Sequence, residues 1–427
     1  MSLLGPLPLR PTYLGLRLAR EPISDLGERK KRSSLSACSY ARLALSVLIA
    51  LFAFCAASSA QVPATMLDQM STEDHLKQPG WWPRKGEANR QDYVGAAACA
   101  ECHQTQAIGQ SQHSMAHTSM LPSESGVLKS PESTFRIGQY SYKIFRDGGQ
   151  ELYSVSDSVN TISNPLEWAF GSGSRGQSYL FRYGGNLYEA RISFFRDRGF
   201  NISPDHPDTP SKTLELALGR VIDRKEEVAC FGCHTVASST NGRFEPGQLM
   251  PGISCEGCHG PGAAHVAIAK AGANVPGLIY NPARLSAAQS VDFCGACHRT
   301  WWDASLFSGI RTVRFPAFRL ESSRCWGNGD KRLTCAACHN PHRPLQHIAS
   351  AYDTNCLSCH RLKATASMQV SPTSSGQPTK GQPLAPACPT GTSRCVTCHM
   401  PKYEIPSMRT IFTDHKIQVV RGKTFRE

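Results

Sequence analysis

The stretch CEGCHGPGAAH, residues 255–265, places two cysteines three positions apart and a histidine directly after the second cysteine. A further histidine, His265, follows six positions after His259. Imidazole nitrogens bind metals, and thiols bind metals or form covalent bonds. So much of this chemistry in one short, glycine-containing segment indicates a bound group.

The first five positions of that stretch, C-x-x-C-H, occur seven times in the chain and hold fourteen of its 18 cysteines. From the first motif to the seventh, the residues are Cys99, Cys102, His103; Cys230, Cys233, His234; Cys255, Cys258, His259; Cys294, Cys297, His298; Cys335, Cys338, His339; Cys356, Cys359, His360; and Cys395, Cys398, His399.

This spacing is typical of covalent haem attachment. Two thiols at positions i and i+3 can add to the two vinyl groups on one edge of a haem, and the adjacent histidine can then ligate the iron from one face. A structural zinc site does not require a histidine directly after the second cysteine. A thioredoxin-like redox pair would normally occur once. The sequence therefore predicts seven covalently bound haem c groups.

Covalent haem attachment takes place outside the cytoplasm, so an export signal is expected. Basic residues up to Arg42 precede the apolar run 43–57, and small residues at 58–60 offer a cleavage site. We interpret residues 1–60 as a cleaved signal peptide and 61–90 as a linker, and we expect a periplasmic or otherwise exported protein. The apolar run is shorter than the about 20 residues of a spanning helix, so membrane association is the less favoured alternative.

The net charge of +13 could suggest nucleic-acid binding, and loss of residues 1–60 would lower it to +8. Two propionates on each of seven haems would more than offset that charge. We therefore interpret the basic side chains as propionate partners and a docking surface, and we expect no nucleic-acid partner.

The expected fold follows from the ratio of chain to cofactor. After cleavage, the chain would have only about 50 residues for each of the seven haems, which is far fewer than the length of an ordinary domain. The porphyrins should then form the core. We predict a mainly α fold with much irregular loop, built as a first haem segment at 91–128 and a six-haem cytochrome domain at 206–427.

The long gap between the first and second motifs predicts a different structure. TFRIGQYSYKIF and ELYSVS flank a glycine turn at 147–149, and SYLFRY and LYEARISFF flank another at 184–186, which is the pattern of two β-hairpins. We predict a small antiparallel β module at 129–205. The segment TLELALGRVI, 213–222, predicts a helix that leads into the second motif.

Each haem iron has a second axial position, and eight histidines lie outside the motifs: His75, His113, His117, His206, His265, His342, His347 and His415. Seven are needed if every haem has two histidine ligands. His342 follows His339 by three residues, which is too short a tether to pass around a haem. We expect His342, and by a similar argument His265, to ligate a neighbouring haem.

Several longer stretches resemble one family. YVGAAACAECH with a downstream SQH, SCEGCHGPGAAH, TCAACHNPH, CVTCHMPK and FTDHKIQVV are similar to the cytochrome c-554-related multihaem cytochromes. The resemblance covers about residues 91–427. It implies that His113, His265, His342 and His415 are distal iron ligands. His117 is a further candidate, and His206, His347 and His75 are unassigned.

Three functions share these motifs. The first is an electron carrier that passes single electrons along mostly bis-histidine haems to and from other redox proteins, with no catalytic residue. The second is an oxidoreductase with one five-coordinate haem acting on a small nitrogen or sulfur oxyanion, for which the second motif, residues 230–234, is the candidate. The third is a subunit of an extracellular haem filament. Because the supply of spare histidines nearly matches the number of irons, we favour the carrier.

Overall fold

The computed structural model describes residues 88–129, 133–240, 243–300, 304, 307–326, 332–360, 388, 391–420 and 425. All of them belong to one compact unit that spans residues 63–427. The predicted signal peptide, nearly all of the predicted linker and His75 lie outside the described residues. In the part of the chain that is described, no helix has both the length and the apolar character to cross a membrane.

The described helices are short, and the longest has 12 residues. The α-helices are α4 (Ala96–Ala100), α5 (Gln104–Ser111), α6 (Leu214–Ala217), α7 (Arg224–His234), α8 (Glu256–His259), α9 (Ala263–Lys270), α10 (Ala287–His298), α12 (Pro316–Glu321), α13 (Cys335–Cys338), α14 (Asp353–Leu357) and α15 (Cys395–His399). The 3-10 helices are η2 (Arg90–Asp92), η3 (Ser114–His117), η4 (Pro122–Glu124), η5 (Pro282–Arg284), η6 (Gly309–Arg314), η7 (Ala349–Tyr352) and η8 (Pro406–Met408).

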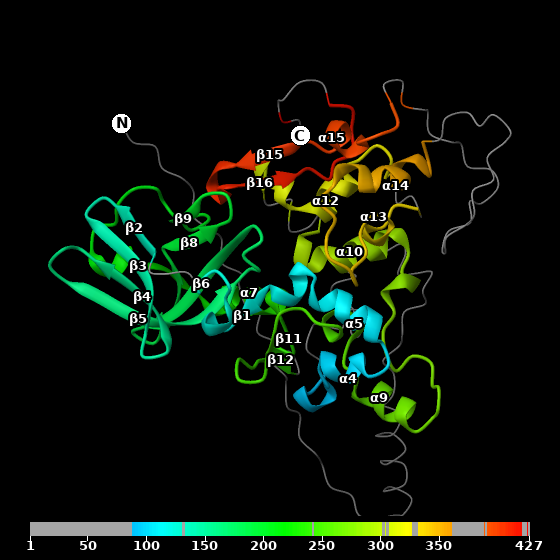
Figure 1. The fold of residues 1–427 in the computed structure, drawn as a ribbon, viewed down its shortest axis with the longest axis horizontal. Coiled ribbons are helices and arrows are strands. Elements are labelled where there is room, and N and C mark those ends of the chain that lie inside the picture. Colours follow the sequence, from blue (N-terminus) through cyan, green and yellow to red (C-terminus); the bar gives the residue numbers. More distant parts are fainter. Residues whose placement is uncertain are drawn as a thin grey trace, which may run out of the picture. The chain divides into compact units, whose positions relative to one another are not determined.

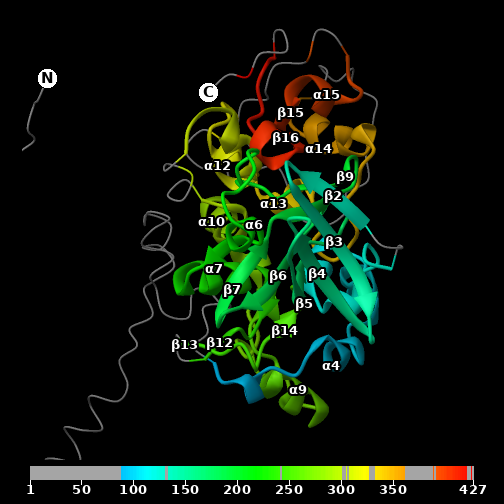
Figure 2. The ribbon, with the colours of Figure 1, turned by 90° about the vertical axis from the view of Figure 1, so that its left-hand side faces the viewer.

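A ten-stranded sheet lies between the first and second motifs in the sequence (Figure 1). Its strands are β1 (Ser119–Met120), β2 (Ser133–Ile137), β3 (Tyr140–Asp147), β4 (Gln150–Ser156), β5 (Thr161–Phe170), β6 (Gly176–Tyr183), β7 (Asn186–Ala190), β8 (Ile192–Phe195), β9 (Gly199–Ile202) and β10 (Gly219–Ile222). The order β10-β7-β6-β5-β4-β3-β2 forms its main path. Strands β7 to β2 can be followed in Figure 2.

Both predicted hairpins are confirmed. Strands β3 and β4 pair antiparallel across the turn at 147–149, and β6 and β7 pair across the turn at 184–186. Alternation along β6 explains how the sheet is packed: Tyr179 and Phe181 lie in the main apolar cluster of the sheet, whereas Leu180 lies in a second cluster on the other face.

The second face of the sheet is where it meets the haem-motif segments. Leu180, Leu187 and Ile222 pack against Phe231 of α7, the helix that ends in the second motif. The sheet therefore provides an apolar support for that motif.

Two sequence predictions are corrected here. The fold is not mainly α, because the sheet is larger than predicted and extends past 129–205 to Ser119 on one side and Ile222 on the other. Only 214–217 of the predicted helix 213–222 is helical; residues 219–222 form β10, which pairs with β7. Pairing with an available strand outweighs the helical preference of a short segment.

Smaller elements complete the described chain. Three two-stranded sheets pair β11 (Thr235–Val236) with β14 (Met250–Pro251), β12 (Ser239–Thr240) with β13 (Arg243–Phe244), and β15 (Lys402–Ile405) with β16 (Thr410–Thr413). The β15–β16 hairpin packs on η6 through Tyr403, Ile405 and Val313. Apart from the sheet, the apolar clusters among the described residues are small. A core formed by haems would have this character, and that part of the prediction stays a prediction.

Candidate functional site

Each C-x-x-C-H motif lies on a single helical turn. The first motif begins in α4, the second ends α7, the third forms α8, the fourth ends α10, the fifth forms α13, the sixth begins in α14 and the seventh forms α15. The amide of His259 donates to the carbonyl of Cys255 at 2.9 Å, and His339 donates to Cys335 at 2.9 Å. Residues i and i+3 of a helical turn share one face, so the two thiols of a motif can reach the same edge of a haem.

Three motif histidines face a histidine from another segment. The ring centroids of His103 and His265 are 6.5 Å apart, those of His259 and His342 are 6.0 Å apart, and those of His339 and His415 are 6.2 Å apart. In each pair, one member belongs to a motif and the other was predicted to be a distal iron ligand.

These separations fit one metal ion between two imidazoles. A metal–imidazole bond is about 2.0–2.1 Å long and the ring centre lies about 1 Å beyond the nitrogen, so two opposed rings have centres about 6 Å apart. The donor set suits haem iron, which takes its axial ligands from two opposite sides. The residues present therefore fit haem at the first, third and fifth motifs.

Hydrogen bonds fix the tautomer of several of these histidines. His259 Nδ1 lies 2.8 Å from the Tyr280 carbonyl oxygen. His399 Nδ1 lies 3.0 Å from the Gln418 carbonyl oxygen, and His415 Nδ1 lies 3.1 Å from the Thr413 carbonyl oxygen. A carbonyl only accepts, so Nδ1 carries the proton. The lone pair is then on Nε2, the atom that would bind iron.

Burial favours the neutral form of His415, His339 and His342. Desolvation is the main cause that lowers the pKa of His415 from 6.5 to about 4, and the nearby His339 lowers it further. Desolvation also lowers the pKa of His339 and of His342, and for His342 the nearby His259 adds to the effect. Neutral imidazole is the form that binds a metal.

Glu256, one of the two variable residues of the third motif, links that motif to the first. Its side chain is buried, and its carboxylate accepts hydrogen bonds from the amides of Val94 at 2.9 Å, Gly95 at 2.8 Å and Gly262 at 2.8 Å. Val94 and Gly95 precede the first motif, and Gly262 lies in the turn before His265. One carboxylate therefore holds the two segments that bring His103 and His265 together.

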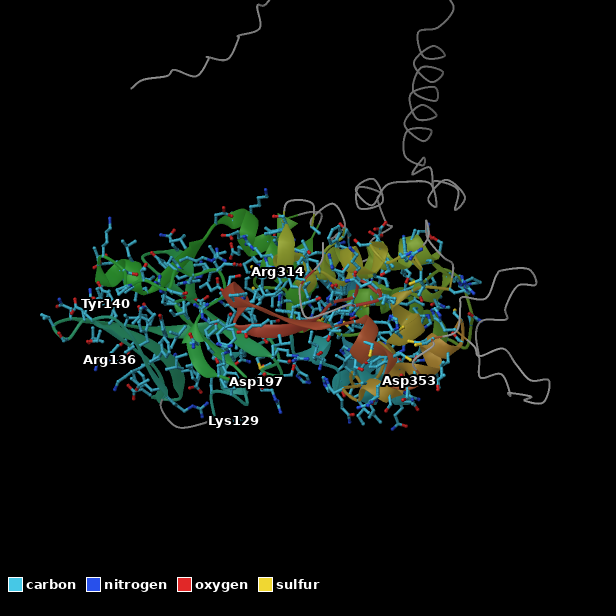
Figure 3. All side chains as sticks on the ribbon, turned by 90° about the horizontal axis from the view of Figure 1, so that it is seen from above. Lys129, Arg136, Tyr140, Asp197, Arg314 and Asp353 are labelled. Carbon is cyan, nitrogen blue, oxygen red and sulfur yellow. The ribbon has the colours of Figure 1, made fainter. Side chains whose placement is uncertain are left out.

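Asp353 has the same role between the sixth and seventh motifs (Figure 3). Its carboxylate accepts from the amides of Arg394 at 2.7 Å and Cys395 at 2.8 Å, at the start of α15. The hydrogen bond from Cys395 contributes most to a lowered pKa for Asp353.

A buried ion pair holds His415. Arg319 of α12 donates to both oxygens of Asp414, at 2.8 and 2.7 Å, and both side chains are almost inaccessible to solvent. Ser323 donates to the carbonyl of His415 at 3.3 Å and accepts from the amide of Ile417 at 2.8 Å. Asp414 is thereby fixed to α12, and His415 and Ile417 are fixed to Ser323 just after that helix.

Further contacts join the remaining motifs. Cys233 Sγ lies 3.6 Å from the Ala296 carbonyl, which places the second motif beside the fourth. Cys258 and Cys294 share one apolar cluster, which joins the third motif to the fourth.

The fifth motif contacts both the fourth and the sixth. Cys294 of the fourth motif is hydrogen-bonded to Cys335 of the fifth, and this bond is the main cause that raises the pKa of the Cys294 thiol. Burial raises it further. On the other side, the side-chain amide of Asn355 donates to the carbonyl of Ala337.

The second motif lies against the sheet. His234 Nδ1 donates to the carbonyl of Thr118 at 2.8 Å, and its ring centroid is 4.9 Å from that of Phe170 on β5. Phe231 in the same motif meets Trp168 and Phe170 edge to face.

The other predicted distal ligands have different surroundings. His113 is buried, but its Nδ1 accepts from the amide of Met115 at 3.1 Å, so its neutral form carries the proton on Nε2. His117 is exposed and its Nε2 is bound to the Ser111 carbonyl at 2.9 Å. The role of His113 and His117 as iron ligands stays a prediction. His206 is buried next to Glu189, and His347 is exposed.

Sequence reasoning missed Glu256, Asp353, Asp414 and Arg319. A charged residue inside or beside a motif is usually solvated, and nothing local distinguishes a carboxylate that will bind a distant backbone segment. The signal is tertiary.

Comparison with known proteins agrees with the motif chemistry. Residues 206–260 match the family described as cytochrome c554 and c-prime. The matched residues include the second and third C-x-x-C-H motifs, and the match supports covalently bound haem c. The chain also aligns with the crystal structure of the outer cell wall cytochrome OcwA, at 15% sequence identity and a TM-score of 0.45, over 77% of this chain and 80% of that chain. No curated protein matches the chain in sequence.

Proposed function

We propose that this chain is an exported multihaem c-type cytochrome that binds seven covalent haems and carries single electrons between redox proteins. The observation that carries the proposal is the pairing of His103 with His265, His259 with His342 and His339 with His415 at ring separations of 6.0 to 6.5 Å. A haem ligated on both faces by protein has no open position for a substrate, which suits a carrier better than an enzyme.

The residues divide the work of holding each haem. Haem supplies the one-electron chemistry when bound. The two cysteines of each motif tether its edge, and the motif histidine ligates one face. His265, His342 and His415 ligate the opposite face of a haem that another segment holds. Protein ligands that cannot exchange, with no axial methionine, favour low reduction potentials.

The contacts between motifs support an order for electron transfer. The first motif adjoins the third through Glu256, the third adjoins the fourth through Cys258 and Cys294, and the fourth adjoins the fifth. The fifth then adjoins the sixth through Asn355, and the sixth adjoins the seventh through Asp353. The second motif joins this path at the fourth. Electrons would enter or leave at the two ends of the path or at the second haem.

A haem count combined with a spin-state count tests the proposal. Under denaturing conditions, the mass of the purified protein should exceed that of the processed polypeptide by seven haems. Electronic absorption spectra and electron paramagnetic resonance spectra of the native ferric protein should show mostly low-spin, six-coordinate iron. A gain of four haems or fewer would contradict the seven-haem proposal. One stoichiometric high-spin haem that turns over nitrite or hydroxylamine would replace the carrier by an oxidoreductase.

A further inference from the structure

A cavity of about 430 Å³ lies where three segments of the described chain meet, and no C-x-x-C-H residue lines it. Asp205, His206 and Pro207 come from the loop after β9, Arg311 comes from η6, and Ser407 comes from η8, in the turn between β15 and β16. The Asp205 amide donates to the Ser407 carbonyl at 3.3 Å, which joins two of these segments directly. The volume is within the range of about 300–1,000 Å³ that is usual for small-molecule sites.

The Asp205 carboxylate in the cavity lining faces two arginines, Arg311 of the lining and Arg314 of the same short helix, η6. Arg311 Nη2 lies 3.7 Å and Arg314 Nη1 lies 3.6 Å from the oxygens of Asp205. Both separations are too long for hydrogen bonds. One negative charge therefore faces two positive charges.

The Arg314 side chain, labelled in Figure 3, shows this deficit most clearly. Its side chain is only 16% exposed, its Nε is buried without a hydrogen-bond partner, and its Nη1 donates to the weak acceptor Met408 Sδ at 2.8 Å. Burial lowers the pKa of Arg314; Asp205 opposes this and Arg311 adds to it. A buried cation in this position calls for a further acceptor.

Aromatic rings hold both guanidinium groups in place. Arg311 lies 5.2 Å from the ring centre of Phe307, and Arg314 lies 5.0 Å from that of Phe315. Because these contacts limit side-chain freedom, less ordering is needed when a ligand binds. The site is therefore partly organised in advance.

The loop that carries Asp205 and His206 is buried at His206, on the side of the sheet. The His206 side chain is 1% exposed, and its Nε2 has no hydrogen-bond partner, with Glu189 Oε2 3.5 Å away. The loop itself is firmly held, because Arg191 donates to the carbonyls of Pro207 and Thr209 at 2.8 Å. This part of the cavity is therefore formed by a fixed loop.

From these observations we infer that the cavity binds an oxyanion with at least two terminal oxygens, held by Arg311 and Arg314 with Asp205 and His206 at its sides. Planar guanidinium groups match paired oxygens of a carboxylate or a small inorganic oxyanion. A cation would meet two like charges, and a neutral ligand would leave the excess positive charge unbalanced. The anion could be a soluble one or a propionate of one of the protein's own haems.

Anion titration and redox titration of the purified holoprotein test the inference and separate the two sources. The probes are acetate and sulfate, and their binding is measured by titration calorimetry at low ionic strength and pH 7. The variants are Arg311→Gln and Arg314→Gln. Arg136→Gln on β2 is the matched control, because it removes the same charge from an exposed side chain.

If a soluble anion is the occupant, the wild type and Arg136→Gln should bind acetate or sulfate saturably, and each cavity variant should bind at least about tenfold more weakly. If a propionate is the occupant, neither anion should bind. Both cavity variants should then shift one midpoint potential that Arg136→Gln leaves in place.

The inference would be overturned if neither anion bound to the wild type and if the redox titrations of Arg311→Gln and Arg314→Gln matched that of Arg136→Gln. Binding of equal strength in all variants would also overturn it. Because the calorimetry needs neither a haem count nor electron transfer, its failure is distinguishable from a failure of the proposed function.

Discussion

Glu256 and Asp353 use the same chemistry in two places, because each buried carboxylate accepts backbone amides from a segment next to another haem motif. Backbone amides are available in every sequence, so a single acidic residue can join two irregular segments without a matching side chain. Hydrogen bonds to a charged acceptor are also stronger than neutral ones. Such residues suit a chain with few long helices.

Replacing Glu256 by Gln should therefore weaken the first haem site. The amide side chain has one acceptor oxygen for three amides and presents its own donors to the others, so we expect a loss of about 3 kcal/mol in the free energy of unfolding. Displacement of the turn before His265 should also make part of one haem high-spin. Denaturant unfolding and ferric spectra of the holoprotein measure the two effects.

The control is Glu215→Gln, which removes the same charge from an exposed side chain in α6. It should leave both quantities unchanged. Equal unfolding curves and equal spectra for the two variants would show that Glu256 does not hold the site.

The Arg319–Asp414 pair makes a second prediction about single residues. Asp414→Asn leaves the buried Arg319 charge uncompensated, which should cost about 3–5 kcal/mol of unfolding free energy and release His415 from one iron. The double variant Arg319→Met with Asp414→Asn removes that charge and should be less destabilised. A double variant that is less stable than Asp414→Asn alone would contradict this account.

Among elements, α7 connects the sheet to the second motif. Phe231 is 2% exposed and its ring lies 5.1 Å from Phe170 and 5.3 Å from Phe244. Because Phe231 is also one of the two variable residues of the motif, the apolar face of the sheet fixes the turn that holds Cys230 and Cys233.

Phe231→Ala should destabilise the holoprotein by about 3–5 kcal/mol, through lost burial and the cavity left behind. It should also perturb the spectrum of one haem. Val228→Ala in the same helix is the control, because Val228 is 39% exposed and should lose little stability. Similar losses for both variants in thermal or denaturant unfolding would mean that α7 does not depend on the sheet.

For the whole molecule, the buried imidazoles set a pH dependence. The pKa of His415 falls from 6.5 to about 4 on folding, so the unfolded chain takes up a proton first as the pH falls. The stability that this histidine contributes is therefore complete above pH 6.5 and is lost as the pH falls toward 4.

Acid titration of the ferric holoprotein should show low-spin iron that persists well below pH 6.5, with conversion to high-spin iron only at about pH 4 or below, because iron competes with the proton for the same nitrogen. The reason is that protons compete with iron for His415 only when the buried imidazole can be protonated. A transition centred near 6.5 would show that the distal histidines are solvated.

Much of this protein is specified by short stretches of its sequence. A haem edge accepts two thiols only from one helical turn, so each C-x-x-C-H motif predicts its own cofactor chemistry wherever it lies. The hairpins at 147–149 and 184–186 were predicted for a similar reason, since glycine turns between alternating strands fix their own pairing.

Tertiary structure alone decided which histidine faces which motif, and which carboxylates join the motifs. His342 faces His259, and His415 faces His339, because packing brings together segments that lie far apart in the chain. The same holds for residues 219–222, which pair as a strand with β7 although their local pattern predicts a helix. Covalent attachment depends on atoms within five residues, whereas ligand pairing and strand pairing depend on contacts whose energy appears only when the whole chain has folded.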